Sequence, residues 1–100
     1  MLTQETITKA LQKDRAYLSS TYGVARIGLF GSYANGTPTK ESDVDLVVEF
    51  NRPIGLRFVE FAEYLERLLG ANVDVLTPAG IQNIRNKRIA QSILKSIVYV

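Results

Sequence analysis

Three short apolar runs, separated by longer stretches with helical periodicity, limit the folds open to this chain more than any other feature. The runs span residues 24–30, 44–50 and 72–76, and their β-branched content predicts strands. The middle run is apolar enough for a strand that is covered on both of its faces. Because helices alternate with these strands, we expect an α/β (α+β) fold, a small mixed β-sheet with helices packed over it.

Helical periodicity covers three other stretches. Apolar residues recur three and four positions apart over residues 3–18, and Asp14 is the one polar residue on that face. Residues 55–69 carry an apolar stripe wider than a single core face needs, so it is expected either to be core throughout or to contact a partner in part. A helix beyond Pro78 is predicted from isoleucines that lie four apart: Ile89, Ile93 and Ile97.

Length and composition restrict the chemistry. One hundred residues fit a single domain over residues 1–100, and 46% hydrophobic with 22% charged residues is typical of a globular chain. The sequence has no cysteine and no histidine. Thiolate nucleophiles, disulfides, structural zinc sites and imidazole-based catalysis are therefore excluded, which leaves carboxylates, hydroxyls, amides, lysine and arginine.

The charge and the N-terminal sequence indicate a cytoplasmic location. A net charge of +2, evenly scattered, is too small to favour direct binding of nucleic acid or of a membrane surface. The first residues lack the apolar core of a signal peptide, and no segment approaches the roughly 18 apolar residues of a membrane span.

Two aspartates stand at the head of the middle apolar run. Asp43 and Asp45 are one residue apart, and the strand period of two places both carboxylates on one face. Two like charges so close repel each other, and a cation that both carboxylates ligate would offset this repulsion. Oxygen ligands without histidine or cysteine favour Mg²⁺, with Mn²⁺ as a second choice. Taken alone, the same pair also fits two solvated acids at the start of a strand.

A third aspartate interrupts the last apolar run. Asp74 lies between Val73 and Val75, so its carboxylate projects to the side opposite the two valines. Three carboxylates from two adjacent strands can hold two metal ions across a phosphate, or hold one while the third accepts a proton from an attacking hydroxyl. The alternative is a solvated residue on an edge strand.

A glycine and a serine follow the first predicted strand directly. At such a turn Gly31 allows close backbone approach, and the N–H groups that follow, with the Ser32 hydroxyl, can bind phosphate oxygens. Gly31 and Gly36 also have the glycine spacing of a P-loop. That motif is excluded because Thr37 and Pro38 stand where it requires lysine and then serine or threonine.

Together these residues form the pattern Gly-Ser, ten residues, Asp-x-Asp, with a later aspartate. In this pattern the sequence resembles the minimal nucleotidyltransferases (MNT) of the DNA polymerase β superfamily, which are antitoxins of HEPN toxins, and the resemblance covers essentially the whole chain. It implies a nucleotidyltransferase core similar to the polymerase β palm. It further implies that Gly31 and Ser32, joined by Ser42, bind the nucleotide, and that Asp43, Asp45 and Asp74 are catalytic and bind metal.

The activity that the resemblance implies is transfer of AMP from ATP to an acceptor hydroxyl, with release of pyrophosphate. For the antitoxin members the acceptor is a tyrosine of the HEPN-type toxin. One position departs from the family, in which the serine is usually followed by Phe or Tyr, Ala, Arg and Gly. Here Asn35 replaces the arginine and cannot offer its cationic fork to a phosphate. Lys40 is a candidate replacement in the same loop, and a solvated loop charge is the alternative for it.

Three functional hypotheses remain at this stage. The first is a Mg²⁺-dependent protein adenylyltransferase, because so short a chain has no acceptor-binding domain of its own and a partner protein must supply that surface. The second is a non-catalytic antitoxin that neutralises its toxin by covering it, which the missing arginine would favour. The third is transfer to a small molecule or to an RNA end. The cluster of Arg85, Lys87, Arg88 and Lys95 fits either a surface that attracts an acidic partner or a solvated helix face.

Overall fold

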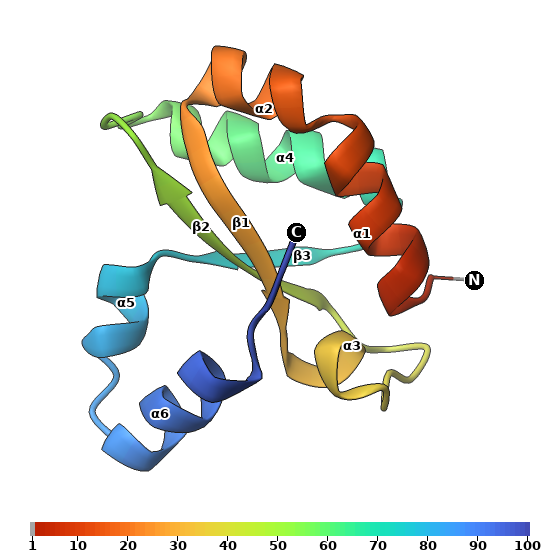
Figure 1. Ribbon diagram of the computed structural model, residues 1–100, viewed down its shortest axis with the longest axis vertical. Coiled ribbons are helices and arrows are strands. Elements are labelled where there is room, and N and C mark those ends of the chain that lie inside the picture. Colours follow the sequence, from red (N-terminus) through yellow and green to blue (C-terminus); the bar gives the residue numbers. More distant parts are fainter. Residues whose placement is uncertain (1) are drawn as a thin grey trace.

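The computed structural model describes residues 2–100 as a four-stranded mixed sheet with helices on both faces (Figure 1). The strand order is β3-β2-β1-β4. β1 pairs antiparallel with β2 and with β4, and β2 pairs parallel with β3. The expected α/β class with a small mixed sheet is confirmed. The strands are β1 (Val24–Phe30), β2 (Val44–Phe50), β3 (Val73–Leu76) and β4 (Val98–Tyr99), and the helices are α1 (Gln4–Lys13), α2 (Arg15–Tyr22), α3 (Gly31–Asn35), α4 (Arg57–Leu69), α5 (Pro78–Gln82) and α6 (Lys87–Ser96).

Each face of the sheet packs against its own set of helices. Val44, Leu46 and Val48 of β2 are buried in the main core with residues of α1, α2 and α4. Val47 of β2 turns the other way and packs with Phe30 and with α5 and α6 in a smaller core. β2 is therefore covered on both faces, as its composition predicts, because alternate side chains of a strand point to opposite sides.

The first predicted helix is wrong in one respect, because residues 4–22 form two helices rather than one. α1 ends at Lys13, Asp14 caps it, and α2 begins at Arg15. The Asp14 carboxylate accepts a hydrogen bond from the hydroxyl of Tyr64 on α4. The polar residue on this otherwise apolar face thus has a partner on a neighbouring helix.

The C-terminal stretch contains elements that periodicity alone does not predict. The chain forms the short helix α5, then α6, and ends with β4 beside β1. Gly28 of β1 makes room for β4, because a Cβ atom at this position would lie 2.5 Å from Cγ2 of Ile97 and 3.0 Å from Cδ1 of Tyr99.

The wide apolar stripe predicted for residues 55–69 is part core and part surface. α4 begins at Arg57, and its residues Phe61, Leu65 and Leu69 are buried. Leu56, just before the helix, is 95% exposed, and Val59 is 62% exposed. Every helix within residues 2–100 is too short or too polar to cross a lipid bilayer.

Candidate functional site

Gly31 turns the chain from β1 into α3 and lies against Asp45. Its φ of +72° falls in the left-handed region that favours glycine. A Cβ atom at this position would overlap the Asp45 carboxylate. The predicted phosphate-binding turn therefore lies directly beside a predicted metal-binding carboxylate, and only glycine permits that approach.

No side chain caps the backbone N–H groups at the start of α3. Phe30 is the N-cap in an extended conformation, and its side chain makes no capping hydrogen bond. The next residue after Gly31, Ser32, is half-buried, and Tyr33 is buried in the main core and anchors the helix. That Gly31 and Ser32 bind phosphate stays a prediction, for which N–H groups without a side-chain cap are suitable donors.

Two of the three aspartates lie side by side on neighbouring strands. Asp45 of β2 is the Cα partner of Asp74 of β3 on one side and of Phe30 of β1 on the other. Directly opposed residues point to the same face, and neighbouring strands lie about 4.8 Å apart. Asp43 precedes β2 by one residue and is two positions from Asp45. The structure thus brings the three acids to one end of one sheet face, the face that also carries Phe30 and Val47 and packs against α6.

Asp45, the acid between Asp43 and Asp74 in the sequence, has a pKa that its surroundings shift. Asp45 is half-buried, whereas Asp43 and Asp74 are exposed. Burial raises the pKa of the Asp45 carboxyl above its usual range, and the nearby negative charges of Asp74 and then of Asp43 raise it further. A raised pKa of this origin means that the site favours a positive charge near Asp45.

The carboxylates of Asp43, Asp45 and Asp74 are suitable ligands for a hard divalent cation, but the three side chains do not point to a common centre. Over residues 2–100, no three acidic side chains lie close enough together, as they stand, to hold a single ion. Three carboxylates on adjacent strands, one of them destabilised by its negative neighbours, are nevertheless the ligands that Mg²⁺ prefers.

The loop between α3 and β2 places the remaining predicted residues. The backbone N–H of Thr39 donates to the Ser42 hydroxyl at 2.8 Å, and the Ser42 N–H donates to the Thr39 carbonyl at 3.1 Å. Ser42 therefore braces the loop, a contact that its predicted role at the nucleotide does not include. Lys40 is exposed in the same loop, and Asn35 is exposed at the end of α3.

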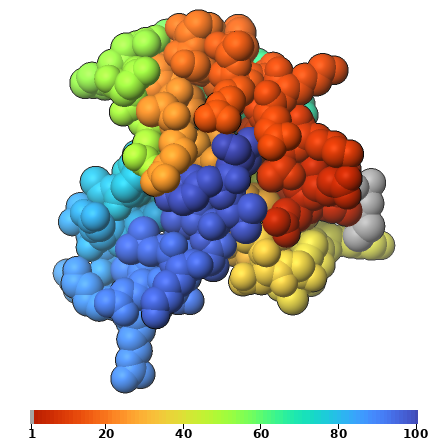
Figure 2. Space-filling view, in the orientation of Figure 1, coloured from red at the N-terminus to blue at the C-terminus, as the bar shows by residue number. Residues whose placement is uncertain are grey.

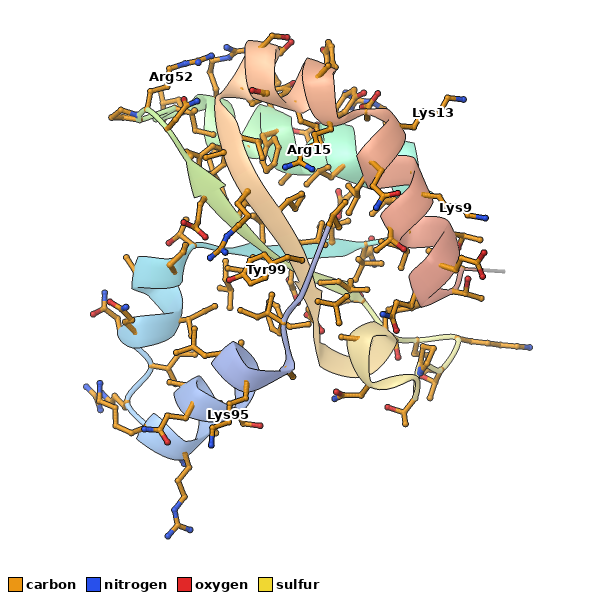
Figure 3. The ribbon with its side chains drawn as sticks, viewed as in Figure 1. Lys9, Lys13, Arg15, Arg52, Lys95 and Tyr99 are labelled. Carbon is orange, nitrogen blue, oxygen red and sulfur yellow. The ribbon has the colours of Figure 1, made fainter. Side chains whose placement is uncertain are left out.

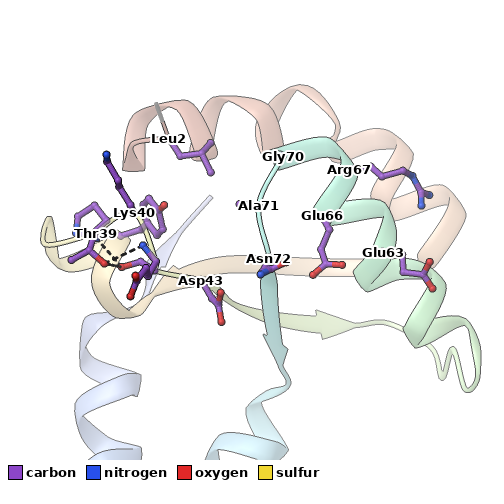
Figure 4. A pocket seen from close by; sticks show the side chains of 14 residues that line it. Leu2, Thr39, Lys40, Asp43, Glu63, Glu66, Arg67, Gly70, Ala71 and Asn72 are labelled. Atoms are coloured by element: carbon purple, nitrogen blue, oxygen red, sulfur yellow. Dashed lines mark hydrogen bonds between the residues drawn. The ribbon is translucent and has the colours of Figure 1, made fainter.

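A hollow of about 790 Å³ opens between this loop and the C-terminal end of α4 (Figure 4). Ser42 and Asp43 line it, together with Lys40, Glu63 and Glu66. Gly31, Ser32, Asp45 and Asp74 do not line it. Asp43 consequently stands between two regions, the hollow on one side and the paired aspartates on the other.

Glu66 supports the site in a way that the sequence pattern does not predict. Its carboxylate accepts a hydrogen bond of 3.1 Å from the backbone N–H of Val73, the residue before Asp74. The N–H of Val44 donates to the carbonyl of Asn72 at 2.9 Å and ties the start of β2 to β3. Glu66 has no sequence signal, because it lies on α4 and its spacing from Asp74 belongs to no motif.

Comparisons with known proteins agree with this geometry. The nucleotidyltransferase domain family matches residues 11–100. Protein adenylyltransferase MntA of Thermococcus cleftensis is 41% identical over 101 residues, which span 100% of this chain and 98% of the relative. A Methanocaldococcus jannaschii protein, whose name also carries the words protein adenylyltransferase, is 41% identical over 103 residues that span 100% of both chains.

Solved structures show the same fold. A minimal nucleotidyltransferase structure superposes with a TM-score of 0.71 and 29% identity, over 97% of this chain and 95% of that chain. An MntA–HpeT toxin–antitoxin structure gives a TM-score of 0.61 at 23% identity, over 100% of this chain and 72% of that one. A toxin–antitoxin structure with AMP-PNP gives 0.56 at 22% identity, over 95% and 84%. With a family match from residue 11 to the last residue and relatives that align over the whole chain, this protein belongs to the nucleotidyltransferase domain family.

Proposed function

We propose that this chain is a Mg²⁺-dependent protein adenylyltransferase that moves AMP from ATP to a tyrosine hydroxyl of a partner HEPN-type toxin, and that it thereby acts as a cytoplasmic antitoxin. The observation that carries the proposal is the position of Asp45, which lies against Gly31 on one side and is paired with Asp74 on the other. A phosphate-binding turn and two carboxylates meet at that point.

The proposed reaction is an in-line displacement at the α-phosphorus of ATP. The acceptor oxygen forms a bond to that phosphorus, the bond to the bridging oxygen breaks, and pyrophosphate leaves. The backbone N–H groups at Gly31 and Ser32 donate to the phosphate oxygens and orient the triphosphate. Asp74 accepts the proton from the acceptor hydroxyl.

Asp43 and Asp45, with Asp74 beside them, are the residues that would hold Mg²⁺. Bound there, the ion supplies charge neutralisation for the triphosphate and for the departing pyrophosphate. The raised pKa of Asp45 supports this assignment, because a carboxylate that is half-buried beside two others is relieved by a nearby cation.

The acceptor and the partner are inferred from the relatives and from the exposure of the acids. The Thermococcus cleftensis relative is named a protein adenylyltransferase, and the structural neighbours include toxin–antitoxin structures, one of them with AMP-PNP, an ATP analogue. Asp43 and Asp74 are exposed rather than enclosed. A folded protein would cover such an open site with its own surface when it binds, which a small molecule cannot do, so a protein acceptor suits this site better.

A second candidate function is neutralisation by binding alone, and Asn35 is the observation that favours it. Asn35 is exposed where the resembling family carries an arginine, so one phosphate-binding cation is missing there. Lys40 lies in the loop that follows α3, lines the hollow together with Asp43, and makes no ion pair within residues 2–100. We expect Lys40→Gln to weaken protection of cells if protection depends on AMP transfer, because the triphosphate then loses a cation. If the chain neutralises its toxin by binding alone, we expect Lys40→Gln to protect as the wild type does.

The experiment that tests the proposed function is transfer of label from α-labelled ATP with Mg²⁺ to a purified HEPN-type toxin. We expect Asp43→Asn to abolish labelling, while the wild type labels a single band. Glu41→Gln is the matched control, because it removes the same charge from an exposed position two residues away and is expected to retain labelling within about twofold. A transfer-competent Asp43→Asn protein would contradict the proposal, and full protection of cells by an inactive Asp43→Asn protein would favour neutralisation by binding.

A further inference from the structure

We infer that the exposed face of α6 is the surface on which the acceptor protein docks, and that the acceptor meets it with an acidic patch that also carries apolar side chains. The inference rests on the proposed function, since it assumes that the acceptor is a protein. It adds where that protein binds and what chemistry its surface has.

The first supporting observation is the charge of the C-terminal part of the chain. Residues 75–100 contain four of the twelve lysines and arginines and none of the ten acidic residues. The four are Arg85, Lys87, Arg88 and Lys95. No ion pair within residues 2–100 involves any of them. A surface segment with cations and no internal counter-charge is complementary to an acidic partner.

The second observation is the arrangement of these side chains on α6. Ala90 and Ile93 turn inward to the smaller core. Arg88 and Lys95 lie seven positions apart, which places them on one face of a helix, and both are exposed. Figure 3 labels Lys95 on α6, and Figure 2 shows the C-terminal segment at the surface of the molecule beside the segment that contains α3.

Two apolar side chains flank this basic face. Ile89 is 51% exposed and Leu94 is 46% exposed. Ile89 and Leu94 lie on opposite sides of the line from Arg88 to Lys95, each between that line and the buried side of the helix. A partner that contacts the cations can therefore also cover apolar area on either side of them, so the two exposed apolar side chains fit a docking surface better than a purely solvated helix face.

The third observation is the position of α6 next to the paired aspartates. α6 packs on Phe30, which is the Cα partner of Asp45, and α6 also contacts α3. The opposite face of the sheet is covered by α1, α2 and α4. An acceptor protein that reaches Asp45 and Asp74 must approach on the α6 side, so a surface there guides it to the reacting groups.

The exposed apolar residues near α4 offer a competing surface, which the geometry disfavours. Leu56 and Val59 follow the far end of β2, whereas Asp45 is at its start. With a rise of about 3.3 Å per residue, the five residues from Asp45 to Phe50 span roughly 17 Å. An acceptor bound only at Leu56 and Val59 would therefore hold its hydroxyl on the wrong end of the sheet.

The test measures binding and AMP transfer with the same purified HEPN-type toxin. We expect Arg88→Glu with Lys95→Glu to raise the dissociation constant about tenfold or more, and to remove most of its dependence on salt. The matched control is Lys13→Glu with Arg15→Glu, an equal change of charge on the opposite side of the sheet at two exposed cations that make no ion pair within residues 2–100, with binding expected within twofold of the wild type (Figure 3). Arg88→Gln with Lys95→Gln is the milder pair if the reversal lowers the melting temperature.

The outcomes separate this inference from the proposed function. If the reversed protein binds and labels the toxin as the wild type does, the docking surface is wrong and the adenylyltransferase stands. If the reversal abolishes binding but no variant transfers label, docking stands and catalysis fails. Absence of both binding and labelling with the wild type overturns both. Tighter binding of a poly(U) oligonucleotide than of the toxin through the same residues overturns the docking surface alone, because its occupant is then RNA.

Discussion

Asp45 stands at the point where the backbone of Gly31, the side chain of Asp74 and the start of β2 meet, and it carries an unfavourable negative charge. Its folded-state pKa is raised by burial, by Asp74 and by Asp43. A carboxyl group with a raised pKa stabilises the fold when it is protonated, and this contribution is lost as the pH rises through its unfolded and then its folded pKa. At neutral pH the ionised side chain therefore lowers the free energy of unfolding.

Asp45→Asn is expected to abolish AMP transfer and, without divalent cations, to raise the free energy of unfolding at pH 7. The gain over the wild type shrinks as the pH falls toward about 4, the ordinary pKa of an aspartate, because the wild-type carboxyl becomes neutral as well. Urea unfolding in EDTA at pH 7 and pH 4 measures both values. An Asp45→Asn protein that is less stable than the wild type at pH 7 would show that the carboxylate has a structural role instead.

Tyr64 and Asp14 form a second polar contact of importance, on the opposite face of the sheet. The Tyr64 hydroxyl donates to Asp14, and this hydrogen bond, together with burial, raises the pKa of Tyr64 to about 12. Tyr64→Phe leaves the carboxylate without its donor, which is expected to cost about 1–2 kcal/mol of unfolding free energy at pH 7. Tyr17→Phe is the control, because Tyr17 packs on the ring of Tyr64 and is itself 44% exposed.

The pH dependence of this contact has a definite sign. The folded-state pKa of Tyr64 lies above its ordinary value of 10.0, so the stability it contributes is complete below pH 10 and is lost as the pH rises toward 12. The difference in unfolding free energy between the wild type and Tyr64→Phe should therefore shrink between pH 10 and about pH 12. A difference that stays constant across that range would contradict the assigned hydrogen bond.

At the scale of elements, β4 depends on the absence of a side chain at Gly28. A Cβ atom there would lie 2.5 Å from Ile97 and 3.0 Å from Tyr99, and the backbone of Gly28 is not in the left-handed region. Gly28→Ala is thus expected to destabilise by crowding alone, at a cost of about 1–3 kcal/mol. Ile97→Ala removes the closest methyl group, so Gly28→Ala should cost less unfolding free energy in the Ile97→Ala protein than in the wild type. Chemical unfolding of the wild type, the two single variants and the double variant measures this coupling energy.

The elements that the sequence predicts correctly are those with a strong local pattern. β1 and β2 have the expected bounds because both strands are long, apolar and ended by glycine or proline signals. The break at Asp14 escapes prediction, since the apolar spacing continues through it and the reason for the break, Tyr64, lies 50 residues away. β4 also escapes, because its two residues pair only where Gly28 leaves room.

The candidate site divides in the same way. The strand period predicts that Asp43 and Asp45 share a face, and the structure places Asp74 beside Asp45 on the adjacent strand. The order of the strands, the contact between Gly31 and Asp45, and the support from Glu66 depend on packing between distant segments. No residue pattern within a single segment contains that information, and the catalytic roles of these residues stay predictions.

At the scale of the whole molecule, the two faces of the sheet are stabilised unequally. Within residues 2–100, the main core contains 14 buried residues, and the smaller core under α5 and α6 contains four: Phe30, Val47, Ile81 and Ala90. Since apolar burial is the chief source of stability, α5 and α6 should open at a lower free energy than the strands. The proposed docking face of α6 therefore belongs to the less stable part of the molecule.

Native-state hydrogen exchange tests this difference directly. We expect the amides of α6 to exchange about a hundredfold faster than those of β1 and β2, through an opening that leaves the main core intact. Ile81→Ala should accelerate exchange in α5 and α6 selectively, because Ile81 is buried in the smaller core alone. Leu11→Ala, in the main core, should accelerate exchange in the strands and the helices alike. Equal protection of α6 and β2 in the wild type would contradict this prediction and mean that the two cores unfold as one unit. In that case a partner bound at α6 would stabilise the entire sheet, including the strand that carries Asp45.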